Sequence, residues 1–227
     1  DLATVLADPT DPSAEATAPT DSDIDDLDNT LHYLHQQAAR PGSPLTAPLD
    51  FSKVGVLGHS SGGGTSVTMA DSPAVRTYVA MAPAPGTPPS TDKPGLIMYG
   101  STDAVVPPTD VNQLYKALPT PKRVIVIKDA GHNVFDDVCT VGANGKRLSD
   151  FLKHVTTANE GLQAWATNVP DGCYPPDVFP TVARPLIDQA TTAQMRYGVG
   201  IDKDPVGLDS GLDNAFPGVH STYAQKS

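Results

Sequence analysis

The sequence predicts an α/β fold in which helices flank a mainly parallel sheet. Four short apolar runs alternate along the chain with segments whose apolar residues have helical spacing. These runs lack the polar and apolar alternation of half-exposed strands, which favours parallel strands covered on both faces. The length of 227 residues suits one α/β domain. Strands that alternate with helices therefore favour a doubly wound sheet.

The first regular element expected is a helix that begins within residues 21–23. Acidic residues there can cap the helix and interact favourably with its dipole, and Arg40-Pro41-Gly42 ends it. Residues 1–20 are rich in Ala, Pro, Thr and Asp without periodicity, and we expect them to be irregular. His32 and His35 are expected at the helix surface rather than at a metal site, because no third ligand lies in register. The apolar face of the helix consists of Ile24, Leu27, Leu31, Leu34 and Ala38.

The middle of the chain supplies four strands and two more helices. One helix is expected over residues 65–71, and another is expected from a Thr109 cap to Leu118. Residues 83–94 hold several prolines and predict an irregular loop. The strands are predicted at Val54–Gly58, Thr77–Ala82, Leu96–Gly100 and Val124–Ile127.

The pattern changes from Asp136 onward. Apolar spacing indicates helices over residues 148–155 and 185–197, whereas residues 198–227 look irregular. We therefore expect a single domain over the whole chain, in which residues 136–227 form a C-terminal extension of helices and loops.

The segment Gly58-His59-Ser60-Ser61-Gly62 has the spacing of a nucleophile elbow. It follows a predicted strand and precedes a predicted helix, which is the context that this pattern requires. A sharp turn of this kind strains the serine backbone and holds the hydroxyl clear of the surface, beside a helix N-terminus. The alternative is a glycine-rich turn without chemistry.

Two further polar residues follow predicted strands, Asp103 after the third and His132 after the fourth. A serine hydroxyl needs a base, and the base needs a carboxylate that orients it. Reactive groups gather where parallel strands end, and the chain order Ser60, Asp103, His132 is the order expected on such a fold. Alternatively, Asp103 caps its own loop and His132 is a surface histidine. His59 is expected to pack beside the elbow rather than act as the base, because it points away from Ser60.

These segments together resemble the α/β-hydrolase superfamily. The resemblance rests on the elbow, on Tyr99-Gly100-Ser101-Thr102-Asp103 and on Ala130-Gly131-His132. The set is similar to the branch that holds dienelactone-hydrolase-like lipases, polyester hydrolases of the cutinase type and platelet-activating-factor acetylhydrolases. It covers about residues 21–152 well and the rest loosely. It implies an α/β-hydrolase fold that cleaves carboxylic esters through an acyl-enzyme, because a serine stands where a dienelactone hydrolase has cysteine.

The resemblance also implies roles for particular residues. His59 and Val105 are candidate substrate contacts, whereas Tyr99 and Trp165, which could line an acyl pocket, are expected in the core. The implied chemistry needs neither a metal nor an organic cofactor, and the expected substrate is a small-molecule, lipid or polyester ester. The implied site consists of Ser60 as nucleophile, His132 as base, Asp103 as acid and the Ser61 backbone N–H as an oxyanion donor.

The chain departs from the superfamily before the elbow. The family places several strands, a helix and an oxyanion loop ahead of the nucleophile, but only 59 residues precede Ser60 here. Without those strands, Val54–Gly58 would be an uncovered apolar edge, which soluble proteins avoid. We therefore expect a partial hydrolase domain that lacks its N-terminal strands and second oxyanion donor, unless a missing N-terminal segment or a complementary chain supplies them.

Net charge and cysteine content limit the kinds of binding partner and the cellular compartment that the sequence favours. A net charge of −11 argues against nucleic acid, which favours a basic face. No apolar run approaches the ~20 residues that span a bilayer, so we expect no stable membrane insertion. Cys139 and Cys173 lie in loop-like segments and are expected to form one disulfide, the alternative being two unrelated thiols. A disulfide, with a weaker likeness of the tail to secreted members of the branch, favours a secreted protein.

Two other functions remain open from the sequence. A non-catalytic α/β module would keep the elbow as scaffold and bind a partner. An acyltransferase would use the same three residues and pass the acyl group to an alcohol. Ester hydrolysis that survives Ser60→Ala would contradict the three-residue site, and the products formed with an added alcohol would separate an acyltransferase from a hydrolase.

Overall fold

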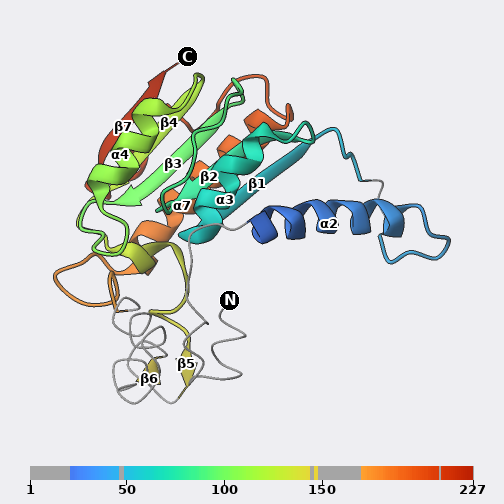
Figure 1. Cartoon of the computed structure of the whole chain (residues 1–227). Helices are drawn as coiled ribbons and strands as arrows, with labels where there is room; N and C mark the ends of the chain where they lie inside the picture. The colour runs from blue at the N-terminus through green and yellow to red at the C-terminus, as the bar shows by residue number, and fades with distance from the viewer. Residues whose placement is uncertain (1–20, 46–48, 144–145, 148–169, 210, 227) are drawn as a thin grey trace.

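The structure is a computed structural model that describes residues 21–45, 49–143, 146–147, 170–209 and 211–226. Its centre is a five-stranded sheet with the strand order β1-β2-β3-β4-β7 (Figure 1). The first four strands run parallel, and β7 runs antiparallel to β4. This sheet confirms the predicted α/β class. The strands are β1 (Val54–His59), β2 (Val75–Met81), β3 (Gly95–Gly100), β4 (Lys122–Ile127) and β7 (His220–Lys226).

Helices cover both faces of the sheet, as the doubly wound prediction requires. Successive residues of a strand point to opposite faces, so Val124 and Val126 of β4 join one apolar cluster and Ile125 and Ile127 join the other. Figure 1 shows α3 and α4 in front of the sheet and α7 behind it. The covering helices are α3 (Ser61–Thr68) and α4 (Pro108–Ala117) on one face and α7 (Pro180–Gly198) on the other.

The parallel strands bring their carboxyl ends to one edge of the sheet. The register pairs His59 of β1 with Met81 of β2, and Gly100 of β3 with Ile127 of β4. The connections after β1, β3 and β4 therefore begin at the same edge of the sheet, and they carry the three predicted catalytic residues. The remaining elements are α2 (Asp21–Ala38), the short helices η1 (Met69–Asp71) and η2 (His132–Phe135), β5 (Gly142–Ala143), β6 (Lys146–Arg147) and α8 (Leu212–Ala215).

The interpretation of residues 198–227 as irregular is wrong, because β7 completes the sheet beside β4. Its sequence, His220-Ser221-Thr222-Tyr223-Ala224-Gln225-Lys226, has no apolar run. A strand at the end of the strand order needs little apolar surface, so its polar composition concealed it. The helix predicted over 185–197 also begins earlier, at Pro180, since proline is well accommodated in the first turn of a helix.

Two helix boundaries differ from the prediction in the middle of the chain. Pro107, not Thr109, precedes the first residue of α4, and α3 begins at Ser61 rather than at residue 65. Local cap patterns place such ends only to within a few residues. The predictions for residues 1–20 and for a helix over 148–155 fall outside the described residues.

Strand β1 differs from the other parallel strands in its exposure. Within the described chain it pairs with β2, and Leu57 on it is 55% exposed while its partner Val79 is fully buried. The prediction that every apolar run is covered on both faces is therefore wrong for β1. Among the described residues, no helix is long and apolar enough to cross a membrane.

Candidate active site

Ser60 occupies the turn between β1 and α3 with a backbone that few residues other than glycine adopt. Its φ is 57° and its ψ is −120°, a strained combination that the surroundings must hold in place. The Ser60 N–H donates to the carbonyl of Met81 at 2.9 Å, and its own carbonyl accepts from the N–H groups of Gly64 and Ala84. The end of β2 and the start of α3 thus hold the turn, as a nucleophile elbow requires.

The two glycines of the elbow pattern are not equally constrained. A Cβ at Gly58 would lie 2.1 Å from the carbonyl oxygen of Gly62, so no side chain fits there. A Cβ at Gly62 would meet no atom within 4 Å. Close approach of strand and helix therefore depends on the first glycine of the pattern.

The start of α3 offers a backbone donor beside Ser60. Ser61 is the first residue of α3, and the first N–H groups of a helix have no acceptor within it. The helix dipole also places partial positive charge at this end. The predicted oxyanion donor is therefore positioned where negative charge is favoured.

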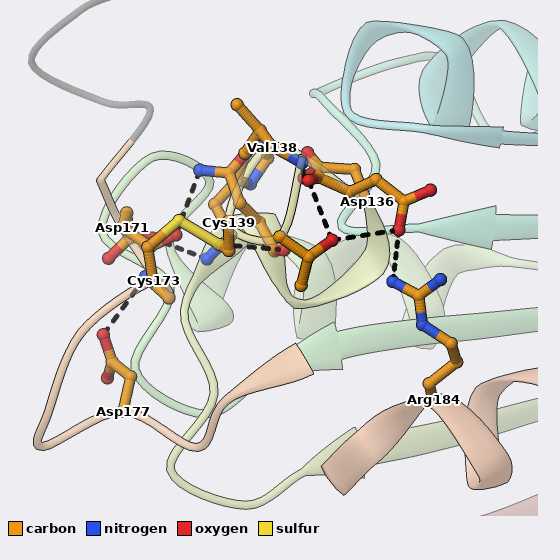
Figure 2. Close-up of a disulfide and its surroundings, with 12 residues drawn as sticks. Asp136, Val138, Cys139, Asp171, Cys173, Asp177 and Arg184 are labelled. Atoms are coloured by element: carbon orange, nitrogen blue, oxygen red, sulfur yellow. Dashed lines mark hydrogen bonds and ion pairs between the residues drawn. A yellow bond between two sulfur atoms is a disulfide. The ribbon is translucent and has the colours of Figure 1, made fainter. Parts of the chain in front are cut away.

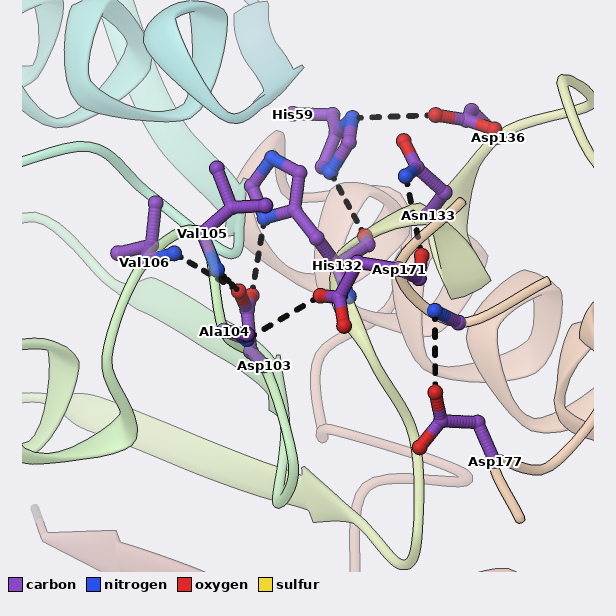
Figure 3. Close-up of polar contacts among 11 residues, drawn as sticks. His59, Asp103, Ala104, Val105, Val106, His132, Asn133, Asp136, Asp171 and Asp177 are labelled. Carbon is purple, nitrogen blue, oxygen red and sulfur yellow. Dashed lines mark hydrogen bonds and ion pairs between the residues drawn. The ribbon is translucent and has the colours of Figure 1, made fainter. Parts of the chain in front are cut away.

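Asp103 and His132 form a buried hydrogen-bonded pair (Figure 3). Asp103 Oδ2 lies 2.9 Å from His132 Nδ1, and the two side chains are 0% and 7% exposed. Because an ionised carboxylate only accepts, this bond places the proton of neutral His132 on Nδ1 and leaves Nε2 as an acceptor. Oδ1 of Asp103 accepts from the N–H groups of Val105 and Val106 at 2.9 and 2.8 Å. Asp103 thus caps its loop and orients the imidazole, so the two readings of this residue are compatible.

His59 links the elbow to the loop that carries His132. Its ring lies 4.5 Å from the His132 ring between centroids, and its Nε2 donates to the backbone carbonyl of His132 at 3.0 Å. Nδ1 of His59 lies 3.8 Å from a carboxylate oxygen of Asp136. These contacts set the elbow and the His132 loop side by side.

The protonation of His59 makes the fold sensitive to acid. Burial, together with the nearby His132, lowers the pKa of His59 to about 4, below the ordinary value of about 6.5. Between these values the unfolded chain binds a proton that the folded protein does not, so the free energy of unfolding falls as the pH falls.

We expect His59→Gln to have a flatter stability profile than the natural protein between about pH 6.5 and about pH 4. The natural protein should lose up to about 3 kcal/mol over this window through His59, a loss that is complete near the lower limit. Urea unfolding at several pH values measures the difference. Equal slopes for both proteins would contradict this assignment.

A family model described as PET hydrolase-like matches residues 11–163, more than half of the chain, and the match spans Ser60, Asp103 and His132. The chain belongs to the PET hydrolase-like family. This membership confirms the α/β-hydrolase resemblance and supports a hydrolase acting on esters. No curated protein matched the chain.

Other predicted residues of this PET hydrolase-like protein have clear positions. Cys139 and Cys173 are both buried and form the predicted disulfide, which indicates an oxidising environment. Tyr99 is buried in the apolar cluster between the sheet and α4, as expected of a core residue. Val105 contributes its N–H to Asp103, and Trp165 lies outside the described residues.

Asp171 contacts the predicted site but was not predicted from the sequence. Its carboxylate accepts a hydrogen bond from the His132 backbone N–H at 2.6 Å and another from the Ala104 N–H at 3.2 Å. Burial raises the pKa of the Asp171 carboxyl, while these two hydrogen bonds oppose the shift. No motif surrounds Asp171, and it lies outside the segment that matches the family, so no local signal indicated it.

Proposed function

We propose that the protein is a serine hydrolase that cleaves carboxylic esters of the polyester type through an acyl-enzyme intermediate. The buried hydrogen bond between Asp103 and His132, together with the strained backbone of Ser60 at the elbow, carries this proposal. Family membership supports the same chemistry, because PET hydrolase-like proteins are named for cleavage of a polyester.

In the proposed first step, His132 Nε2 accepts the hydroxyl proton of Ser60 as Oγ attacks the ester carbonyl. Asp103 keeps the other ring proton on Nδ1 and stabilises the imidazolium that forms. The tetrahedral intermediate collapses as the imidazolium donates its proton to the leaving alcohol oxygen. Water then attacks the acyl-enzyme with His132 again as base, which releases the acid and restores the Ser60 hydroxyl.

The N–H of Ser61 is the proposed donor to the oxyanion of the tetrahedral intermediate. A single donor of this kind lowers a barrier by about 3 kcal/mol in related chemistry. We also propose that His59 and Val105 border the ester substrate, because each is hydrogen-bonded directly to a member of the acid–base pair.

Both the disulfide and the proposed polyester substrate favour a location outside the cell. An enzyme that acts on a solid polyester outside the cell works where disulfides persist. We therefore propose that the protein is secreted.

A fluorophosphonate probe tests the proposed nucleophile without a choice of substrate. The natural protein should form one covalent adduct, which peptide mass spectrometry should assign to Ser60, and His132→Ala should react far more slowly. Hydrolysis of a p-nitrophenyl ester and of a polyester film then measures turnover. Labelling at another residue would overturn the proposal, and a transesterified product that predominates when an alcohol is added would identify an acyltransferase instead.

A further inference from the structure

Residues 170–178, which we call the clamp segment, form hydrogen bonds with both of the loops that carry Asp103 and His132. One carboxylate oxygen of Asp171, Oδ2, accepts from the backbone N–H of His132 at 2.6 Å and of Ala104 at 3.2 Å (Figure 3). Ala104 directly follows Asp103 in the chain. A single oxygen atom therefore joins the backbone of the base to the backbone beside the acid.

The backbone of Asp171 adds two more contacts to the same loop. Its carbonyl accepts from the backbone N–H and from the side-chain amide of Asn133, both at 3.0 Å. The next residue, Gly172, passes so close to Gly131 that a Cβ at Gly131 would lie 2.4 Å from the Gly172 nitrogen. The residues on either side of His132 thus contact the clamp segment by backbone.

The clamp segment is itself fastened at two further points (Figure 2). The disulfide joins Cys173 to Cys139, which follows His132 in the same chain segment. Asp177 accepts from the Gly172 N–H at 3.2 Å and from the Thr102 hydroxyl at 2.8 Å. The segment is therefore tied to the His132 loop by a covalent bond and to the Asp103 loop by a hydrogen bond.

We propose that Asp171 is a positioning residue that sets the distance between the carboxylate of Asp103 and the imidazole of His132, and that the Cys139–Cys173 disulfide keeps Asp171 in place. The inference rests on the proposed function. It adds a residue that touches neither substrate nor reacting atoms and acts through the backbone of the acid–base pair.

Two variants separate this role from general stabilisation. Asp171→Asn keeps a carbonyl oxygen that can accept both N–H groups, and it should retain kcat within about threefold. Asp171→Ala removes the acceptor, and its kcat should fall roughly 10- to 100-fold with KM nearly unchanged, because misplaced catalytic groups slow the reaction steps more than binding. Asp171→Ser, which is too short to bridge both loops, replaces the alanine variant if that protein does not fold.

A spectroscopic measurement tests the same geometry independently of turnover. The Nδ1 proton between His132 and Asp103 should give a low-field proton resonance in the natural protein and in Asp171→Asn. We expect this resonance to weaken or shift in Asp171→Ala. If Ser60 proves not to be the nucleophile while the resonance still changes, the proposed function fails and the positioning role stands.

Reduction of the disulfide tests whether the disulfide and Asp171 act on kcat through the same constraint. In the natural protein, a reductant should lower kcat to about the level of Asp171→Ala, and in that variant it should lower kcat much less, since both changes remove one constraint. Asp202→Asn is the control, because it removes the Asp202–Arg196 ion pair, and Arg196 lies in the last turn of α7. This variant should keep the natural kcat and the natural His132 resonance.

The positioning role is overturned by any of three results. The first is a kcat of folded Asp171→Ala within threefold of the natural value, and the second is an unchanged His132 resonance in that variant. The third is that the fold reduction of kcat caused by the reductant is the same in Asp171→Ala as in the natural protein. A lowered melting temperature with natural kcat would identify Asp171 as a structural brace only.

Discussion

Replacing Ser60 with alanine should reduce kcat/KM for ester hydrolysis on the order of 10⁴-fold or more. The variant retains the backbone donor of Ser61 and the Asp103–His132 pair, but it has no oxygen that can attack the ester and form the acyl-enzyme. A p-nitrophenyl ester assay with the natural protein and the variant measures the effect.

Ser61→Ala is the matched control, since it removes a hydroxyl from the adjacent position and keeps the backbone N–H. It should retain most of the natural activity, because the proposed oxyanion donor is that N–H. Comparable losses in both variants would mean that the elbow was disturbed, and natural activity in Ser60→Ala would show that Ser60 is not the nucleophile.

Asp103→Asn should reduce kcat about 10³- to 10⁴-fold while the protein stays folded. Oδ1 of Asp103 accepts two backbone N–H groups, so the amide oxygen of the asparagine will take that position. Its NH₂ group will then face Nδ1 of His132 and donate to it. This forces the ring proton onto Nε2, where it blocks transfer from Ser60.

Asp129→Asn provides the comparison for that variant. Asp129 lies on the same connection as His132 with a φ of 50°, a conformation that asparagine tolerates, and its side chain is largely exposed. We expect natural kcat for Asp129→Asn, whereas a kcat near the natural value in Asp103→Asn would refute the orienting role of Asp103.

Local sequence patterns predicted the part of the site that lies next to the sheet. The elbow, Asp103 and His132 each come within five residues of the end of an apolar run, so strand prediction also located the candidate residues. Parallel strands end at one edge of the sheet, and this topological rule predicts that the three connections lie together.

Local sequence patterns did not predict elements or residues whose role depends on a partner far away in the sequence. Strand β7 has no apolar run because it lies at the end of the sheet and, among the described strands, pairs with β4 alone. Asp171 lies 39 residues from His132 in sequence and contacts it through backbone N–H groups, which every residue except proline possesses. No residue type at either position reveals such a contact.

The sequence by itself determined the parallel strands, the elbow and the residues proposed as acid, base and nucleophile. These follow from apolar runs, turn residues and side-chain chemistry, which are local properties of the chain. Tertiary structure alone decided the place of β7, the low pKa of His59 and the bridge formed by Asp171. Each of these results from burial or hydrogen bonding between segments far apart in sequence, because desolvation and backbone contacts arise only once the chain is packed.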